Sequence, residues 1–189
     1  VNMSGFDSIP ADLGAFLAGD ELVQKYHTKV THMQGYTTTN NANYSGGTMA
    51  SLLGTLDMPS KDVKRQADPY LLNPSGTQPK SSRPKEKDQT LPCFDETIQK
   101  WTTPWLMATI NTRVVRRSLG LRKKYDPKGV GMGDNAAYNE TAPTPNAFVA
   151  FLMWLAIAIF IGLCLIKPTR KLLLKFALPS PGEGPSEEQ

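Results

Sequence analysis

Apolar residues recur at intervals of three and four near the start of the chain, a spacing typical of one face of an α-helix; they are Ile9, Leu13, Phe16 and Leu17. Pro10 is tolerated in a first helical turn and Asp12 suits its positive end, so a helix is predicted to begin there. Residues 28–38 are rich in β-branched and aromatic side chains and are predicted to form a strand. A short helix is expected over 49–56, with Thr48 as its cap.

The pattern changes in the middle of the chain. Residues 57–92 contain six prolines among Lys, Ser, Asp and Gln, and few apolar side chains are present to hold a core. This stretch is predicted to be a flexible insertion. Folding is expected to resume at Phe94, with a helix over 111–118 and a loop rich in Gly, Asp and Asn over 129–135.

Residues 147–166 form an uncharged apolar run without proline. Twenty helical residues extend roughly 30 Å, the thickness of a bilayer's hydrocarbon core, so the run predicts a membrane-embedded helix. Lys and Arg are absent from 132–146 but follow the run, which would place its C-terminal side in the cytoplasm if the helix crosses. The alternative is insertion from one side, with 170–176 lying at the interface as a basic amphipathic continuation.

The charge is unevenly distributed. The whole chain carries +4, whereas residues 61–131 hold 15 Lys and Arg against 7 Asp and Glu, a local charge of about +8. This stretch is expected to form a solvated surface, with anionic lipid or a phosphate-bearing cofactor as alternatives. No zinc-finger or recognition-helix pattern accompanies it, so nucleic acid is not expected as a partner. The two cysteines and two histidines predict no metal site and no disulfide framework.

Three motifs carry a resemblance to a known family: residues 5–14 (GFDSIPADLG), 46–51 (GGTMAS) and 114–118 (VVRRS). In this order, with the apolar run and a closing 181–188 (PGEGPSEE), they resemble the saccharopine dehydrogenase-like oxidoreductases. That broad family includes trans-acting enoyl reductases of lipid biosynthesis. The resemblance covers most of the chain outside 57–92, and the first motif is the most specific.

The resemblance implies an α+β fold, the second, substrate-side domain of a Rossmann-type two-domain oxidoreductase, with one membrane-embedded helix. Residues 1–56 would contain the end of the nucleotide domain and the start of the α+β domain. The insertion 57–92 would follow, then the rest of that domain (93–146), the membrane helix (147–166) and a basic juxtamembrane tail (167–189). No glycine-rich phosphate loop is present in the sequence, and the chain is expected to be an internal piece of a longer protein.

The resemblance also implies NAD or NADP as the cofactor, with contacts at the first motif; the residues are Gly5, Phe6, Asp7, Ser8 and Pro10. The residues alone favour a plainer interpretation, in which Asp7 and Ser8 cap the helix and Gly5 serves a turn. Arg113, Arg116 and Arg117 lie at one-turn spacing and are expected to be a solvated helix face, or alternatively a contact for an anion or lipid headgroup.

The predicted function is therefore hydride transfer to a lipid-like substrate at the surface of a lipid droplet, the ER or a mitochondrial membrane. Membrane lipids are the expected partners, and no catalytic residue is assigned. Two alternatives remain. One is a non-enzymatic membrane scaffold or assembly subunit that retains the family shape. The other is a module that binds membranes electrostatically through 61–131.

Overall fold

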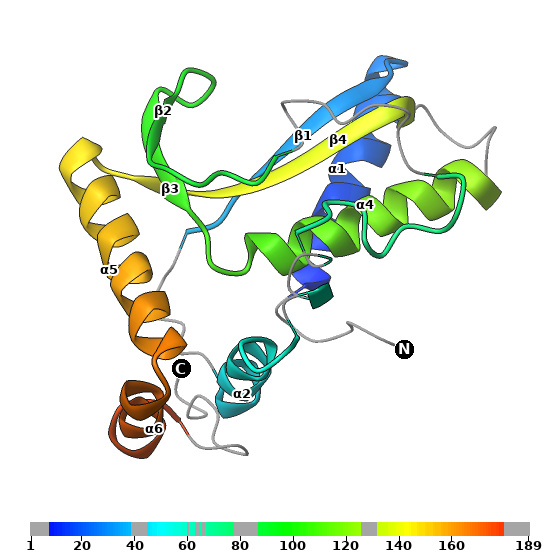
Figure 1. Cartoon of the computed structure of the whole chain (residues 1–189). Coiled ribbons are helices and arrows are strands. Elements are labelled where there is room, and N and C mark those ends of the chain that lie inside the picture. The colour runs from blue at the N-terminus through cyan, green and yellow to red at the C-terminus, as the bar shows by residue number, and fades with distance from the viewer. Residues whose placement is uncertain are drawn as a thin grey trace.

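A computed structural model describes residues 8–38, 45–59, 61–62, 65, 67–77, 87–125 and 132–179, with the main chain only for 132–135. Within these ranges the chain forms a four-stranded sheet and five helices (Figure 1). The elements are α1 (Ile9–Tyr26), β1 (Val30–Tyr36), α2 (Gly46–Thr55), β2 (Cys93–Asp95), β3 (Lys100–Pro104), α4 (Ala108–Tyr125), β4 (Met132–Thr144), α5 (Ala147–Leu165) and α6 (Lys167–Phe176). The fold is mixed α and β.

The sheet has the strand order β1-β4-β3-β2. β1 runs parallel to β4, while β3 is antiparallel to both β4 and β2. The two outer strands are joined by a hydrogen bond of 2.8 Å from the Tyr36 hydroxyl to Asp95 Oδ2, so the sheet must curl to bring its edges together. Burial and the Asp95 carboxylate together raise the pKa of Tyr36 to about 12.

The helices α1 and α4 cover one face of the sheet, as Figure 1 shows. The apolar centre of this packing consists of Ala15 from α1, Val115 from α4 and Tyr138 from β4, with Ala11, Met33 and Leu119 beside it. Polar residues account for much of the remaining interior; Thr102, Thr103, Asn111, Thr112 and Glu140 are all buried. Buried polar groups need hydrogen-bond partners, so this interior depends strongly on specific geometry.

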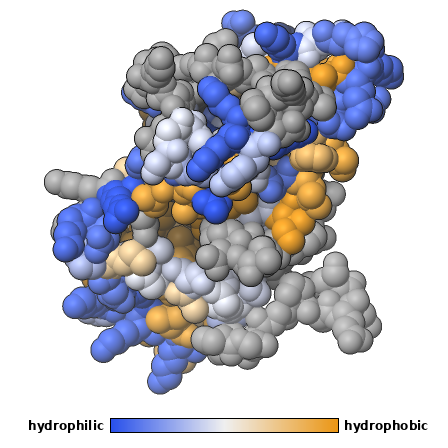
Figure 2. Space-filling view, turned by 90° about the vertical axis from the view of Figure 1, so that its right-hand side faces the viewer, coloured by the Kyte–Doolittle hydropathy of each residue, from blue (hydrophilic) through white to orange (hydrophobic). Residues whose placement is uncertain are grey.

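The predicted first helix is confirmed by α1, but the apolar face that its spacing marks is not the face that packs into the core. Leu13, Phe16 and Leu17 are 54%, 43% and 63% exposed, whereas Ala15 and Gly19 are buried. Small residues let the helix axis approach the sheet closely, and this outweighs the burial of the larger side chains. The exposed apolar residues form an orange strip on the right-hand side of Figure 2, over α1.

The strand predicted over 28–38 is confirmed by β1, and the helix predicted over 49–56 by α2. The predicted cap of α2 is wrong. Ser45 has the extended cap conformation and its hydroxyl accepts a hydrogen bond of 3.2 Å from the Thr48 amide, which places Thr48 inside the first turn. The loop predicted over 129–135 is also wrong in part, because β4 begins at Met132.

The apolar run forms α5, a helix long and apolar enough to cross a membrane, and most of its side chains are exposed. Two residues near opposite ends of α5 are nevertheless buried: Ala150 is fully covered and Cys164 is 2% exposed. The Trp154 indole N–H donates to the Thr90 carbonyl, which attaches the first half of the helix to the domain. After a break at Ile166, α6 turns away, and Arg170 forms an ion pair of 2.7 Å with Asp57.

Parts of the predicted insertion 57–92 are held against α4. Asn73 donates to the Arg116 carbonyl, and the carbonyl of Leu72 accepts from Arg117. A Cβ atom added at Gly120 would lie 2.7 Å from the Thr77 hydroxyl, so this segment approaches the helix closely. The carbonyls of Pro69 and Leu72 accept from arginines of α4, whereas the amides of Leu71, Asn73 and Thr77 bond within the segment as turns.

Candidate functional site

Four polar side chains meet between α1 and the sheet. The Ser8 hydroxyl donates to Asn111 Oδ1 at 3.0 Å, and Asn111 Nδ2 donates to Glu140 Oε1 at 3.1 Å. The Thr37 hydroxyl donates to the same Glu140 oxygen at 2.8 Å. Ser8, Asn111 and Glu140 are each at most 5% exposed, and Thr37 is half-buried. We refer to these four residues as the Glu140 cluster.

Separate elements hold each member of this cluster. Ser8 directly precedes α1, Thr37 directly follows β1, Asn111 lies in the first turn of α4 and Glu140 lies in β4. Because β1 and β4 are parallel with Tyr36 opposite Thr141, Thr37 and Glu140 come together near the carboxyl end of β1. In open α/β sheets ligands commonly bind outside the carboxyl ends of strands. The α1 N-terminus at this place adds a positive end of a helix dipole.

Burial raises the pKa of the Glu140 carboxyl, and the hydrogen bonds from Thr37 and Asn111 lower it by a smaller amount. The other carboxyl oxygen, Oε2, is shielded from solvent and has no hydrogen-bond partner among the described residues. Nearby, burial also raises the pKa of Asp12, which accepts a hydrogen bond of 2.9 Å from Ser118. No cation among the described residues pairs with this carboxyl, so burial favours its neutral form.

The structure brings one of the predicted cofactor residues, Ser8, into the Glu140 cluster. Gly5, Phe6 and Asp7 lie outside the described residues, and Pro10 is exposed in the first turn of α1. The interpretation of Ser8 as a side-chain cap is wrong, because its hydroxyl points to Asn111 and makes no cap hydrogen bond. Only its carbonyl serves the helix, accepting from the Asp12 amide at 3.1 Å.

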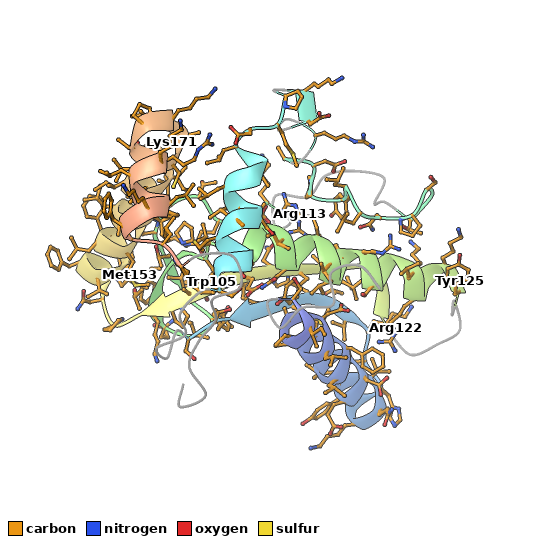
Figure 3. The ribbon with its side chains drawn as sticks, turned by 90° about the horizontal axis from the view of Figure 1, so that it is seen from below. Trp105, Arg113, Arg122, Tyr125, Met153 and Lys171 are labelled. Atoms are coloured by element: carbon orange, nitrogen blue, oxygen red, sulfur yellow. The ribbon has the colours of Figure 1, made fainter. Side chains whose placement is uncertain are left out.

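The three arginines of α4 do not form the expected solvated face. Arg113 and Arg116 are 6% and 3% exposed, and Arg117 alone faces solvent. Arg113 forms an ion pair with Asp88 (Figure 3 shows Arg113 near the beginning of α4).

The Arg116 guanidinium donates to the Tyr138 carbonyl from Nε and Nη2, at 3.2 and 3.0 Å, and to Asn139 Oδ1 at 2.9 Å. β3 pairs with β4 only from Thr141 onward, and this leaves the Tyr138 carbonyl for Arg116. Both buried guanidinium groups are thus engaged inside the protein.

Sequence reasoning missed Thr37, Asn111 and Glu140 as site residues. Glu140 lies in a stretch, 136–144, whose small and polar residues give no clear strand pattern. The signal that could have found it is a single carboxylate among Ala, Tyr and Thr next to the apolar run. Even so, the residues of the cluster are up to 132 positions apart in the chain, and only the fold brings them together.

The Glu140 cluster can hold a polar ligand atom by hydrogen bonding. Its uncharged amide, hydroxyl and carboxyl groups suit a carbonyl or carboxamide better than a phosphate, because Asp12 lies in the adjacent first turn of α1. Among the described residues no group of three or more His, Cys, Asp and Glu side chains is arranged to hold a metal ion. The chemistry available at the site is therefore hydrogen bonding and proton donation by a carboxylic acid.

Comparison with known proteins gives one kind of relative. Two Mycobacterium tuberculosis proteins, from strains H37Rv and CDC 1551, carry the provisional name trans-acting enoyl reductase and are each 30% identical to the chain over 201 residues. The match covers 98% of this chain and 46% of each relative, so the chain spans about half the length of the curated relatives it matches. No family model matches the chain, and no solved structure matches it significantly. The chain is thus related in sequence to proteins named as reductases.

Proposed function

We propose that the chain is part of a membrane-associated, NAD(P)-dependent oxidoreductase of the saccharopine dehydrogenase-like type, acting on a lipid-like substrate by hydride transfer. The observation that carries this proposal is the similarity along 98% of the chain to proteins named trans-acting enoyl reductases. An enoyl reductase saturates a carbon–carbon double bond next to a carbonyl group, and nicotinamide cofactors supply hydride for such chemistry. The family motifs at 5–14, 46–51 and 114–118 point in the same direction.

In this proposal the described fold is the substrate-side domain, and the segment before α1 lies near the nicotinamide. The first turn of α1 suits this end of the cofactor. Asp12 would repel a pyrophosphate there, whereas an uncharged carboxamide can hydrogen-bond to groups such as the Ser8 hydroxyl and the Asn111 amide. The pyrophosphate would be held by residues of a longer protein.

The membrane attachment that we propose is insertion from one side. If α5 crossed a bilayer, its C-terminal end would be roughly 30 Å from its other end and on the opposite side from the sheet. Arg170, just past that end, instead pairs with Asp57, and Cys164 is buried. Both ends of α5 therefore stay with the same body of the protein, and the helix can lie in the interface with its exposed side in lipid; that side includes Phe148, Phe151, Leu155 and Ile159.

The short helix α6 suits the same arrangement. It carries Lys167, Arg170, Lys171 and Lys175 together with exposed Leu172, Leu174 and Phe176. A basic amphipathic helix of this kind places its lysines among headgroups, with Leu172 and Phe176 on the opposite face among acyl chains. The surface of a lipid droplet, the ER or a mitochondrial membrane would each accept such an anchor.

The alternative of a non-enzymatic membrane scaffold predicts the same anchor without hydride transfer. The third hypothesis, electrostatic binding through 61–131, loses some of its basis because Arg113 and Arg116 are buried and engaged. That hypothesis predicts salt-sensitive vesicle binding after deletion of 147–166, whereas the proposed anchor predicts binding that depends on this helix and resists salt.

Deuterium transfer tests the proposed activity. The protein is incubated with a 2-enoyl thioester and with NADH or NADPH deuterated at C4 of the nicotinamide. We expect the saturated product to gain one deuterium from one face of the nicotinamide, as read by mass spectrometry. If no deuterium is transferred from either cofactor while the protein still binds vesicles, the oxidoreductase is rejected in favour of the membrane scaffold. Because the chain spans about half of its relatives, the assay is run on the chain and on the corresponding longer protein.

Cysteine labelling tests the one-sided anchor. Cys93, exposed in β2, serves as an internal reference for the side on which the sheet lies. Lys171→Cys, exposed in α6, is introduced in a Cys164→Ser background and the protein is inserted into intact vesicles. We expect an impermeant maleimide to modify both cysteines to the same extent before the vesicles are opened. Protection of one cysteine but not the other would establish a crossing helix.

A further inference from the structure

Among the described residues, one carboxyl oxygen of Glu140 has hydrogen-bond partners and the other has none. Oε1 accepts from Thr37 and from Asn111, and the Asn111 amide is held in this orientation by the Ser8 hydroxyl. Two donors occupy the two lone-pair directions of Oε1. The proton of a neutral carboxyl must then reside on Oε2, which is buried and lacks a partner within the described part of the chain. A buried donor without a hydrogen-bond partner is costly, so an unpaired Oε2–H lowers the free energy of unfolding.

Within the described part of the chain, the charged and titratable groups around Glu140 do not supply a counter-ion. Asp12 on α1 is acidic, and Tyr138 on β4 has a pKa raised first by burial and then by the charges of Glu140 and Asp12. On α4, Arg113 is paired with Asp88 and Arg116 is directed to the Tyr138 carbonyl. Without a cation beside it, a carboxyl group in this interior keeps its proton to higher pH than an exposed glutamate does.

We propose that Glu140 donates a hydrogen bond from Oε2 to the carbonyl oxygen of the ligand, an acyl compound whose carbonyl is conjugated to the double bond. This inference rests on the proposed function for the identity of that ligand. A donor at the carbonyl oxygen draws electron density from the conjugated carbon chain and makes its β-carbon more electrophilic. A carboxylate cannot do this, so the buried, uncompensated position is what the role requires.

The position of the cluster is consistent with ligand access. Thr37, its only half-buried member, lies just past the carboxyl end of β1, so a ligand would approach from that end. Ser8, on the other side, is the described residue of the motif that the family resemblance places near the nicotinamide.

Isotope-edited infrared spectroscopy of the purified chain, without cofactor, tests this role. The probe is trans-2-octenoyl N-acetylcysteamine thioester carrying ¹³C at its carbonyl. We expect the carbonyl stretch to fall on binding, and this shift to disappear as the pH rises through the raised pKa of Glu140. Glu140→Gln keeps a donor in place, so its shift should persist and be independent of pH. Glu140→Leu should lose the shift and bind the thioester roughly 2- to 10-fold more weakly.

Asp95→Asn, which changes a carboxylate bonded to Tyr36 on the outer strand, is the matched control and should behave as the parent protein. A pH-dependent shift that survives in Glu140→Gln would overturn the inference, as would an unchanged shift in folded Glu140→Leu. If Glu140→Leu does not fold by circular dichroism, the pH profile of Glu140→Gln decides alone. If the pH-dependent infrared shift is observed but no deuterium is transferred, only the oxidoreductase activity is rejected. If deuterium is transferred but the infrared shift is absent, only the role of Glu140 is rejected.

Discussion

Adjacent arginines on α4 should differ sharply in their contribution to stability. Arg116→Met removes the donors to the Tyr138 carbonyl and to Asn139 Oδ1, while a methionine retains part of the apolar stem. Each acceptor that loses its donor costs about 1–3 kcal/mol, so the two together predict a loss of about 2–6 kcal/mol in the free energy of unfolding. Arg117→Met is the matched control. Arg117 is exposed and makes one hydrogen bond, of 2.8 Å, to Leu72, so the loss should stay within about 1 kcal/mol.

Urea unfolding followed by tryptophan fluorescence, in a fixed concentration of mild detergent, measures this difference. A loss of about 2–6 kcal/mol corresponds to a midpoint lower by about 1–3 M if the dependence on urea is about 2 kcal/mol per molar. Because native domains have only about 5–15 kcal/mol of stability, Arg116→Met should approach the limit of folding. Equal midpoints for the two variants would refute the buried role of Arg116 and would indicate that its guanidinium group lies on a solvated helix face.

Two further perturbations follow from the same interior. The folded-state pKa of Glu140 is raised, so its contribution to stability is fully present below the unfolded value of about 4.3 and is lost as the pH rises through the folded value. The glutamine of Glu140→Gln cannot ionise, so this variant should gain stability relative to the parent protein as the pH rises. The titration of Asp12 contributes equally to both proteins and cancels in the comparison. A difference in urea midpoint that stays constant with pH would contradict this prediction. The Cβ added by Gly14→Ala in α1 meets no atom within 4 Å, so this variant should gain about 1 kcal/mol of stability. The Cβ added by Gly120→Ala in α4 would meet Thr77 and Asn73, so this variant should lack that gain. Thermal melts compare the two variants.

Much of the secondary structure could be predicted from local pattern. The first helix, the strand after it, the short second helix and the apolar helix each have strong periodicity or composition, and each is present. The sheet as a whole could not be predicted. β4 is the strand that joins the two halves of the sheet, yet its residues are mainly small and polar. Its strand conformation comes from pairing with β1 and β3, which are distant in sequence, and no local preference indicates it.

The side of each helix that packs into the core could also not be predicted from the local sequence pattern. Periodicity identifies an apolar side of α1, but the core packs against the side with Ala15 and Gly19, since close approach to Tyr138 and Val115 requires small residues there. The arginines of α4 show the opposite error. Three positive charges at one-turn spacing suggest a solvated surface, and two of them are buried because Asp88 and the unpaired edge of β4 supply acceptors. The sequence does not reveal acceptors that only the fold creates.

The same reasoning explains why the candidate site was found only in part. The motif at 5–14 identifies Ser8 through resemblance, but the chemistry around Ser8 comes from Asn111 and Glu140, which belong to α4 and β4. A glutamate in a polar stretch is ordinarily exposed and ionised, and its composition alone gives no reason to treat it otherwise. What distinguishes Glu140 is a balance set by position: two donors on one oxygen, none of the nearby arginines directed to its carboxyl, and burial of the other oxygen. Without the two donors the acid would lose its orientation, and with a cation beside it the acid would ionise. The proposed role therefore depends on Oε2 having no partner, as is the case among the described residues.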